Sequence, residues 1–469
     1  MIIAAFVAAL TGCGGNGRGS AAEGEPSTAV EAVRPKPPSN PTPDGETELL
    51  LVGLDGATWH VIDSLLAQGN LPNLSRLIET GVRGRLESER PIQSPPVWTT
   101  IATGKTREQH GIETFFVVRD DDKKIPVTTR MRTARPFWDI FSEMGISVGV
   151  MGWWPSWPAE EVRNGFIISD RAWPVRFSPN AVPYGTRRDE TGSVVEWDFE
   201  RRTWPEELFE EFRPFIVTEE AVVRPEITEQ IFGSRAKPRQ EMWNAYWVYA
   251  KDITFVRSGL HFLSKRRPRV FAIYLEGADV MSHYYWHYRP AEKFEISPED
   301  RALFGDAVDR YYRYADEVIG RLLRTAGEET AILIVSDHGF ETLWDLKVKW
   351  ERGEEIEHEG GKGGYPYTHA LHGIFIASGP GFANGVRVEG ASIYDVMPTL
   401  MHRMGLPAGE DMPGRVLKEA FESNFIERHP LERIPTWERA EQQKSTDTIV
   451  EGPMDDAILE KLKTLGYVD

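Results

Sequence analysis

Short apolar runs that alternate with long helical patterns constrain the fold of this chain most strongly. Helical patterns at residues 240–263, 304–326 and 392–404 separate several of the runs. Such alternation is typical of a mostly parallel sheet that is covered by helices on both faces. We therefore expect an α/β fold with a mostly parallel central sheet. The candidate strands are residues 48–54, 147–151, 165–169, 269–275, 331–336 and 373–377.

Metal-binding residue types follow or end three of these candidate strands. Asp55 follows the first strand, Asp279 and His283 follow residues 269–275, and Asp337 and His338 come at the end of residues 331–336. Each pattern alone is more often a helix cap or a turn. Open α/β sheets place their sites at the carboxyl ends of the strands, so their joint occurrence there indicates one site. Carboxylates and imidazoles suit zinc, and also manganese or iron.

A serine followed by two prolines lies in residues 91–112 and predicts the start of a helix. Ser94 is a favoured N-cap, proline is favoured at the first helical position, and Thr103-Gly104 would end the helix. The Ser94 hydroxyl would then lie at the positive end of a helix dipole, where unpaired backbone N–H groups can receive an anion. The alternative is an ordinary Ser-Pro helix start with no chemistry.

The N-terminal residues are apolar up to Leu10 and continue as Thr11-Gly12-Cys13. This pattern resembles a bacterial lipoprotein signal, in which the chain is cut before the cysteine and the cysteine is lipidated. The apolar run is too short to span a bilayer. The resemblance implies a signal segment at residues 1–12 and a lipid anchor on Cys13. It also implies a place in the bacterial cell envelope, facing the periplasm or the exterior. The alternative is a chance apolar terminus with a buried thiol.

The rest of the chain divides into a tether, a folded body and a tail. Residues 13–47 are Gly/Ser-rich and then Pro-rich, which is typical of a flexible tether. Residues 48–425 form the body, and within it residues 171–237 are an insertion that either caps the site or is structural. Residues 426–469 form a tail with a short amphipathic helix near its end. The net charge of −18 argues against binding to a nucleic-acid polymer.

An ordered set of motifs gives the chain a specific resemblance over about residues 48–382. It resembles the alkaline phosphatase superfamily and, within it, the type I phosphodiesterase/nucleotide pyrophosphatase family. This implies an alkaline phosphatase-like catalytic domain that hydrolyses phosphate esters, phosphodiesters above all. The matching residues are Leu54-Asp55-Gly56, Pro72-Asn73-Leu74, Ser94 with Pro96, Thr103-Gly104, His110-Gly111-Ile112, Asp279 with His283, Ser336-Asp337-His338-Gly339 and Gly379-Pro380-Gly381.

The resemblance also implies two divalent metal ions, zinc with manganese as the alternative. Asp279, His283 and a later histidine would bind one ion. That histidine is His369, with His372 as the alternative and His358 as a more remote candidate. The second ion would be bound by Asp55, Ser94, Asp337 and His338.

Ser94 is the nucleophile that the resemblance implies. It would form a covalent phosphoseryl intermediate that water then hydrolyses, with no general base needed for the first step. A metal ion lowers the pKa of a hydroxyl bound to it, which supplies the activation that a serine lacks. In this family an asparagine commonly follows the His-Gly-Ile turn and holds a phosphate oxygen. This chain reads Glu113-Thr114-Phe115-Phe116 there, so substrate choice depends on other groups.

Several alternatives are compatible with the same motifs. Sulfatases of this superfamily need an arginine at the position of Trp98, so sulfatase modification is not expected. A phosphomonoesterase, a phosphonate hydrolase and an enzyme that transfers a phospho-headgroup share the fold. The expected substrate is a small-molecule or lipid-headgroup phosphate ester, and the membrane is contacted through the lipid anchor. A non-enzyme alternative is a surface-anchored binding lipoprotein with a decayed site.

Overall fold

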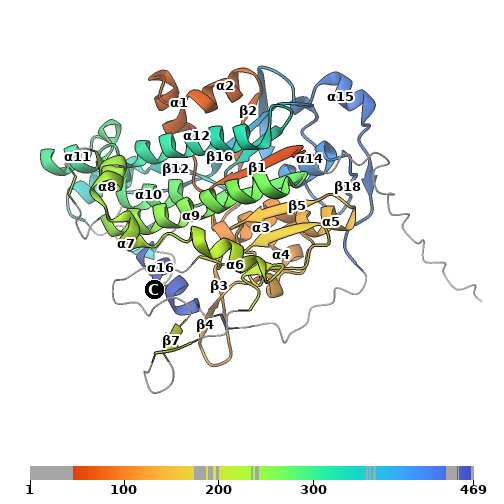
Figure 1. Ribbon diagram of the computed structural model, residues 1–469. Coiled ribbons are helices and arrows are strands. Elements are labelled where there is room, and N and C mark those ends of the chain that lie inside the picture. Colours follow the sequence, from red (N-terminus) through yellow and green to blue (C-terminus); the bar gives the residue numbers. More distant parts are fainter. Residues whose placement is uncertain are drawn as a thin grey trace, which may run out of the picture. The chain divides into compact units, whose positions relative to one another are not determined.

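A nine-stranded sheet forms the centre of the fold (Figure 1). The computed structural model describes residues 46–173, 186–188, 194–196, 200–233, 236–237, 242–354, 357–358, 361–362, 366–439, 451–452 and 454–465. In spatial order the strands are β17 (Val386–Ser392), β2 (Val82–Glu87), β16 (His372–Ser378), β11 (Ala331–Val335), β1 (Leu49–Leu54), β10 (Val270–Leu275), β5 (Val148–Met151), β6 (Gly165–Ile168) and β9 (Thr203–Trp204).

The sheet is mostly parallel. β11, β1, β10, β5 and β6 run parallel to one another, and β16 and β9 run in the opposite direction. β1 lies at the centre, and each of its six residues is buried. Strands that are covered on both faces read as continuous apolar runs, which explains why β1 is legible in the sequence. The predicted fold class is confirmed.

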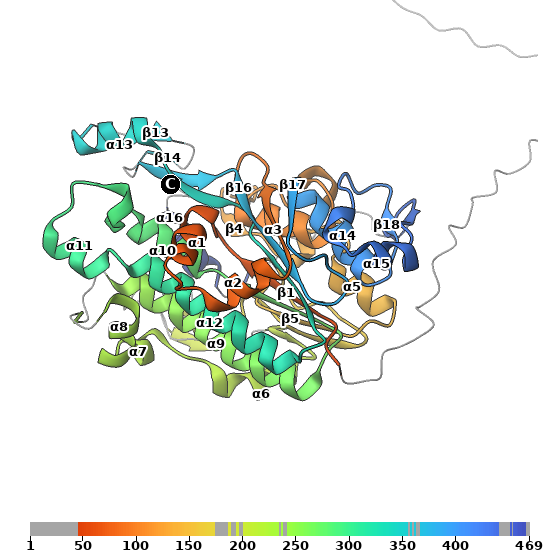
Figure 2. The ribbon, with the colours of Figure 1, turned by 90° about the horizontal axis from the view of Figure 1, so that it is seen from above.

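Successive side chains of the central strands enter two separate cores. Leu50, Val52 and Leu54 pack into one core, whereas Leu49 and Leu51 pack into the other. This follows from the two-residue period of a strand. The first core is covered by α1 (Trp59–Ala67), α2 (Pro72–Glu79), α9 (Trp243–Arg266), α10 (Gly277–Tyr285) and α12 (Ala307–Ala326). The second is covered by α3 (Ser94–Thr103), α5 (Phe137–Glu143) and α14 (Val396–Arg403), and Figure 2 shows the two helical layers on either side of the sheet.

The six predicted strands all lie in this sheet, but β2, β17 and β9 were not predicted. β2 alternates buried and more exposed residues, with Arg83 and Arg85 among the latter. β17 is an edge strand with five residues that are not buried, and β9 has only two residues. These strands lack the apolar run that marks a doubly covered strand, so the sequence did not reveal them.

A two-stranded ribbon follows β11. It pairs β12 (Gly339–Thr342) with β15 (Tyr367–Ala370) in antiparallel register. Between these strands lie α13 (Trp344–Glu351), β13 (Glu357–His358) and β14 (Gly361–Lys362). The ribbon therefore brings residues near 369 back to the end of β11.

Part of the predicted insertion belongs to the core. Leu208 and Phe212 of α6 (Leu208–Phe212) and Ile231 of α8 (Pro225–Phe232) pack into the core that also contains α9. α7 (Glu219–Val222) lies between these helices, and β9 extends the central sheet. β7 (Thr186–Arg188) and β8 (Val194–Glu196) pair as a hairpin. Residues 174–185, 189–193, 197–199, 234–235 and 238–241 lie outside the described residues, and the capping role stays a prediction.

Shorter elements complete the described part of the chain. They are α4 (Arg107–His110), β3 (Phe116–Val118), β4 (Lys124–Pro126), α11 (Pro298–Phe304), β18 (Ala408–Gly409), α15 (Ser423–Arg428), β19 (Arg433–Ile434) and α16 (Asp455–Thr464). α16 corresponds to the amphipathic helix predicted in the tail.

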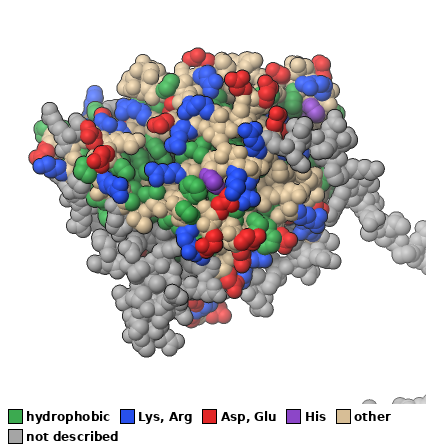
Figure 3. All heavy atoms as spheres, in the orientation of Figure 1, with side chains coloured by type: hydrophobic (Ala, Val, Ile, Leu, Met, Phe, Trp, Pro, Cys, Tyr) green, Lys and Arg blue, Asp and Glu red, His purple; other side chains and the backbone are tan. Residues whose placement is uncertain are grey.

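The surface carries charges of both signs. On the face in Figure 3, Lys and Arg side chains are interspersed with Asp and Glu side chains. Within the described part of the chain, the helices all fall short of the length and apolar character needed to cross a membrane. The predicted signal segment, Cys13 and almost all of the tether lie outside the described residues.

Candidate metal centre

Three of the predicted ligands meet where β1 and β11 end. These neighbouring strands are parallel, so Asp55 after β1 and Asp337 and His338 after β11 reach the same edge of the sheet. Asp55 is 1% exposed, and the other two side chains are fully buried. One ligand atom from each residue lies within 4.8 Å of the other two. We call Asp55, Asp337 and His338 the strand-end group.

Hydrogen bonds determine which oxygen of each carboxylate faces the centre. Asp55 Oδ2 accepts a hydrogen bond from Trp98 Nε1 at 3.2 Å and another from the Tyr274 hydroxyl. Asp337 Oδ1 accepts one from the Gly56 N–H at 3.2 Å. The second oxygens, Asp55 Oδ1 and Asp337 Oδ2, are buried and make no hydrogen bond. Each carboxylate therefore has one occupied and one available oxygen.

His338 is oriented in the same way. Its Nδ1 lies 2.8 Å from the Gly339 carbonyl oxygen, and because a carbonyl only accepts, Nδ1 carries the hydrogen. In the neutral, metal-binding form of the ring, Nε2 would hold a lone pair, and it makes no hydrogen bond to the protein. It lies 3.4 Å from Asp55 Oδ1 and 3.4 Å from Asp337 Oδ2. A histidine whose other nitrogen donates to a carbonyl is a typical metal ligand.

The other predicted ligands come together beside this group. Asp279 and His283 lie one turn apart on α10, so their side chains share a face of the helix. The ribbon brings in His369 from β15, whose Nε2 lies 3.3 Å from Asp279 Oδ1 and 3.0 Å from His283 Nε2. One ligand atom from each residue lies within 4.8 Å of the other two. We call Asp279, His283 and His369 the helix-ribbon group.

The two groups are adjacent. His338 Nε2 lies 3.9 Å from Asp279 Oδ1, and the rings of His338 and His369 stack with centroids 3.8 Å apart. Gly56 permits this approach, because a Cβ at this residue would lie 2.8 Å from Asp279. Its φ of +66° also favours glycine. Glycine is therefore needed at residue 56 for two reasons: it allows the backbone turn after β1, and it allows Asp279 to approach this turn.

Four buried polar atoms without hydrogen bonds converge here. They are Asp55 Oδ1, Asp279 Oδ1, Asp337 Oδ2 and His338 Nε2. The three oxygens all lie within 3.9 Å of the nitrogen. Buried polar atoms that are left unpaired destabilise a fold, and a divalent cation would satisfy all of them. The donor set and its geometry therefore fit metal ions.

The pKa values of the strand-end group follow from its crowded charges. Burial lowers the pKa of His338, but the neighbouring carboxylates, Asp337 foremost, outweigh burial and raise it to about 10. Burial and the nearby Asp55 carboxylate raise the pKa of Asp337 well above its usual value. The carboxylates thus repel one another in the absence of a cation.

In the helix-ribbon group the shifts have the opposite sign. Burial, together with the positive charge on His338, lowers the pKa of His369 to about 4. Burial raises the pKa of Asp279, but the adjacent His283 and then His369 outweigh it and hold that pKa well below its usual value. A neutral His369 beside an ionised Asp279 is the protonation state that binds a metal.

Ser94 is the first residue of α3 and is 3% exposed. The N-cap is Gln93, so the prediction that Ser94 itself caps the helix is wrong by one residue, a usual error for helix boundaries. The first turn of α3 also has fewer free backbone N–H groups than predicted. Pro95 and Pro96 have no N–H, and the Val97 N–H donates to the Gln93 carbonyl at 3.2 Å.

α3, the helix that begins at Ser94, contacts the strand-end group through Trp98. Trp98 follows one turn later on the same helical face and donates its indole N–H to Asp55. The indole packs on Gly53, where a Cβ would lie 2.8 Å from the ring. Gly104 ends the helix with a φ of +70°, as the sequence predicted.

The alternative histidine ligands lie elsewhere. His372 is the first residue of β16, is exposed, and pairs in register with Glu87. It belongs to neither group, whereas His369 does. His358 lies in β13, but its side chain is outside what the structure describes.

An apolar side chain occupies the segment where the family resemblance implied an asparagine. Phe115 is 2% exposed and packs with Leu462 of α16 and with Trp154. The Glu113 carbonyl oxygen accepts a hydrogen bond from Arg107 at 3.3 Å. This segment therefore presents packing contacts where an amide was expected.

Trp98 and Tyr274 are the site residues that sequence reasoning missed. Both donate hydrogen bonds to Asp55 and so select its free oxygen. A phenol inside the apolar run 269–275 was the available signal for Tyr274. Trp98 carried no comparable signal, because a tryptophan within a helix is more often core packing.

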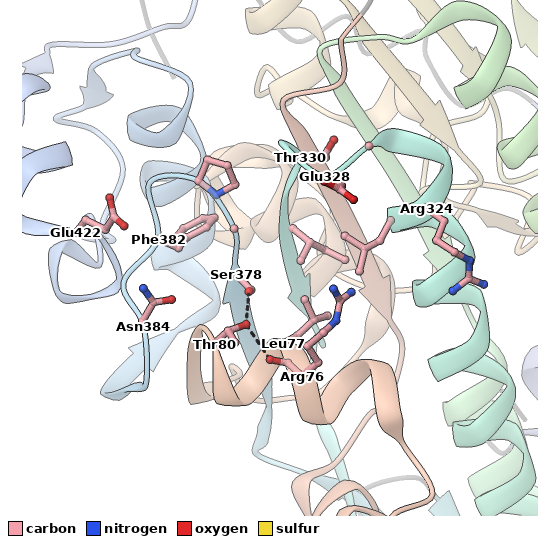
Figure 4. A pocket seen from close by; sticks show the side chains of 15 residues that line it. Arg76, Leu77, Thr80, Arg324, Glu328, Thr330, Ser378, Phe382, Asn384 and Glu422 are labelled. Atoms are coloured by element: carbon pink, nitrogen blue, oxygen red, sulfur yellow. Dashed lines mark hydrogen bonds between the residues drawn. The ribbon is translucent and has the colours of Figure 1, made fainter.

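A cavity of about 600 Å³ lies at the opposite edge of the sheet (Figure 4). It is lined by the start of β11 and the end of β16, whereas the metal ligands follow the carboxyl ends of β1 and β11. Arg76 and Arg324 line it from the last turns of α2 and α12, where cations complement a helix C-terminus. This cavity is separate from the metal centre.

The fold and the two ligand groups define an α/β protein with a candidate two-metal site at the carboxyl edge of its central sheet. The chain belongs to the type I phosphodiesterase/nucleotide pyrophosphatase family, whose sequence model matches residues 49–403. It is therefore a phosphoric ester hydrolase.

Solved structures of two ectonucleotide pyrophosphatase/phosphodiesterases resemble the chain at 14% sequence identity. Human ectonucleotide pyrophosphatase/phosphodiesterase 5 matches over 80% of this chain and 100% of its own, with a TM-score of 0.47. The murine protein 5 matches over the same shares at 14% identity with a TM-score of 0.45. An inactive variant of the murine protein in complex with AMP matches over 80% and 100% at 14% identity, with a TM-score of 0.44. No curated protein matches the chain.

Proposed function

We propose that this chain is a phosphodiesterase that acts through a covalent phosphoseryl intermediate on Ser94, with two zinc ions at the metal centre. The observation that carries the proposal is the convergence of four buried ligand atoms that make no hydrogen bond. Asp55, Asp337, His338 and the Ser94 oxygen would hold one ion. The helix-ribbon group would hold the other. Mixed nitrogen and oxygen donors suit zinc, with manganese as the alternative.

The proposed reaction has two displacements at phosphorus. When bound, the metal ions lower the pKa of a coordinated hydroxyl and stabilise charge on the attacking and leaving oxygens. Ser94 Oγ gives its proton to water and forms a bond to phosphorus as the ester P–O bond breaks, and the departing alkoxide takes up a proton from water to leave as the alcohol. Water then attacks the phosphoseryl ester and releases the phosphate product and free Ser94. Trp98 and Tyr274 hold Asp55 in position throughout.

The start of α3 supports a diester over a monoester. A monoester brings a second negative charge that needs additional donors. The two prolines after Ser94 remove N–H groups, and the buried Phe115 offers no polar group. A diester carries a single charge and makes a smaller demand on such a site.

A comparison of four substrates tests this proposal. Purified protein is stripped of metal and reloaded with zinc or with manganese. Rates are then measured on bis-nitrophenyl phosphate, nitrophenyl phosphate, a phosphonate monoester and nitrophenyl sulfate. We expect the diester to react fastest and the sulfate to be inert. A faster monoester or phosphonate would replace the proposal with one of those activities, and no metal with no turnover would indicate a binding protein with a decayed site.

We further propose that Cys13 is lipidated and anchors the enzyme in a bacterial cell envelope, facing the periplasm or the exterior. The Leu10-Thr11-Gly12-Cys13 sequence supports this. β1 begins at the edge of the sheet opposite the metal centre, so the first described residues, 46–48, lie away from the site. We expect the wild-type protein to partition into detergent and Cys13→Ala to stay in the aqueous phase. Equal partitioning of the two would contradict the anchor.

A further inference from the structure

The C-terminal helix α16 packs against the helix that carries Asp279 and His283. Lys461 of α16 is 7% exposed, and its ammonium contacts the carboxylate of Glu276. Glu276 directly follows β10 and directly precedes α10, so it forms the junction between the two. A residue near the end of the chain thus reaches the start of a ligand-bearing helix.

This junction is held by buried charges. Glu276 is 3% exposed and also accepts a hydrogen bond from Lys251 Nζ at 2.5 Å. One carboxylate is therefore placed between two ammonium groups. The Lys461 ammonium also lies over the rings of Trp247 and Trp154, at 5.0 and 5.5 Å from their centroids. Cation–π contacts of this kind strengthen when water is excluded.

The backbone of the same junction is fixed from the other side. The N–H groups of Glu276 and Gly277 lie 3.4 and 3.2 Å from the Asp252 carboxylate oxygens and donate to them. Tyr311 OH donates to the same carboxylate at 2.5 Å. α9 and α12 therefore hold the backbone of the junction, while Lys461 and Lys251 hold its side chain.

A second contact lies at the far end of α10. Tyr284, the residue after His283, donates a hydrogen bond from its hydroxyl to Thr464 Oγ1 at 3.0 Å. At the start of α16, Asp455 forms a buried ion pair with Arg171 at 2.7 Å. α16 is thus anchored in the body, and it contacts α10 near the start and near the end of α10.

We propose that α16 supports the helix-ribbon group and that Lys461 is a positioning residue which fixes α10 through Glu276. The inference rests on the proposed two-metal function. Removing a group that orients a metal ligand without touching the metal typically lowers metal affinity about 10- to 100-fold. Loss of Lys461 removes one of the two ammonium groups that hold the Glu276 side chain, three residues before Asp279. Within the described residues, the strand-end group makes no hydrogen bond or ion pair with α16, so it serves as the internal reference.

Zinc binding to the full-length protein tests the role. In Lys461→Met, which keeps an unbranched chain between the two tryptophans, we expect one of two zinc equivalents to bind about 10-fold more weakly in a chelator competition. We expect kcat to fall and KM to stay within about twofold. Lys461→Arg keeps the charge and should recover most of the affinity. Lys463→Ala, an exposed lysine on the same helix, is the matched control and should bind zinc as the wild type does.

Each outcome separates this inference from the proposed function. A wild-type protein that binds no zinc would overturn the function itself. Two zinc equivalents of wild-type affinity in Lys461→Met would overturn the positioning role alone. A raised KM with unchanged zinc binding would place the ammonium against substrate and would also overturn it.

A second variant keeps the test valid if Lys461→Met does not fold. Thr464→Val removes the hydroxyl that accepts from Tyr284, at an exposed position. The proposal expects a loss of about two- to threefold in the same zinc equivalent. No change in Thr464→Val would then contradict it.

Discussion

The two ligand groups are held by different kinds of structure. The strand-end group comes from two neighbouring strands, so the sheet register alone sets its spacing. The helix-ribbon group comes from a helix and a two-stranded ribbon, and its position depends on how these elements dock. Asp337 and His338 have fully buried side chains, whereas the His283 side chain is 16% exposed. One half of the centre is thus built into the sheet and the other half is assembled on it.

The largest expected effect comes from Ser94, which we assign to the sheet-built half. Ser94→Ala should lower turnover on the order of 10⁴-fold, because the nucleophile is lost. Most zinc binding should persist, since six other ligands are present. Ser94→Thr keeps a hydroxyl and is the control. Near-normal turnover in Ser94→Ala, measured on the nitrophenyl diester, would overturn the mechanism.

Ligand removal should affect the two halves differently. Asp337→Asn and His369→Ala should each lose one zinc equivalent by elemental analysis, with turnover falling more than about 100-fold. Excess zinc should restore part of the activity only in His369→Ala, because Asp279 and His283 still share a face of α10. Equal rescue of both variants would remove the distinction between the two halves.

The pH dependence of metal-free stability should also separate the groups. His338 has a pKa raised from 6.5 to about 10, so the stability it contributes is present below pH 6.5 and is lost as the pH rises toward 10. His369 has a pKa lowered from 6.5 to about 4, so stability is lost as the pH falls from 6.5 toward 4. Each slope can reach about 1.4 kcal/mol per pH unit.

Urea unfolding of the metal-free protein from pH 4 to 10 measures the free energy of unfolding on both sides of pH 6.5. We call the loss of stability toward pH 4 the acidic limb and the loss toward pH 10 the alkaline limb. His338→Gln should flatten the alkaline limb, and His369→Gln should flatten the acidic limb. Zinc should stabilise the wild type near neutral pH, where the ligands are deprotonated, because it binds the folded state. An alkaline limb unchanged in His338→Gln, or an acidic limb unchanged in His369→Gln, would contradict the opposite signs of the two shifts.

The smallest expected effect is at His372. It is exposed and belongs to neither group, so His372→Ala should keep both zinc equivalents and change turnover less than about twofold. Elemental analysis beside His369→Ala checks this. Zinc loss in His372→Ala with His369→Ala unaffected would move the ligand role to His372.

The sequence predicted the sheet-built half better than the assembled half. An apolar run followed by Asp55, or by Asp337 and His338, locates a ligand at a strand end because the strand is legible. His369 was chosen through a family resemblance, since no local pattern separates it from His372. The ribbon that decides between them is held by long-range pairing of β12 with β15.

The support of the site was not predictable for the same reason. Trp98, Tyr274 and Lys461 act through contacts that join distant parts of the chain. The sequence predicted α16 as an amphipathic helix, but its apolar face does not tell which surface it covers. The N-cap of α3 was misplaced by one residue because Gln93, which makes no side-chain cap hydrogen bond, precedes Ser94.

The occupied oxygens of Asp55 and Asp337 have a consequence for ion selectivity. Each carboxylate has one oxygen engaged by protein donors and presents only the other to the centre. Each of the two side chains would therefore bind an ion through one oxygen, and each ligand group offers few donor atoms. Calcium requires six to eight oxygen ligands, often with bidentate carboxylates, whereas zinc is satisfied by about four. We therefore expect the indole, phenol and amide hydrogens around the two aspartates to disfavour binding of calcium relative to zinc.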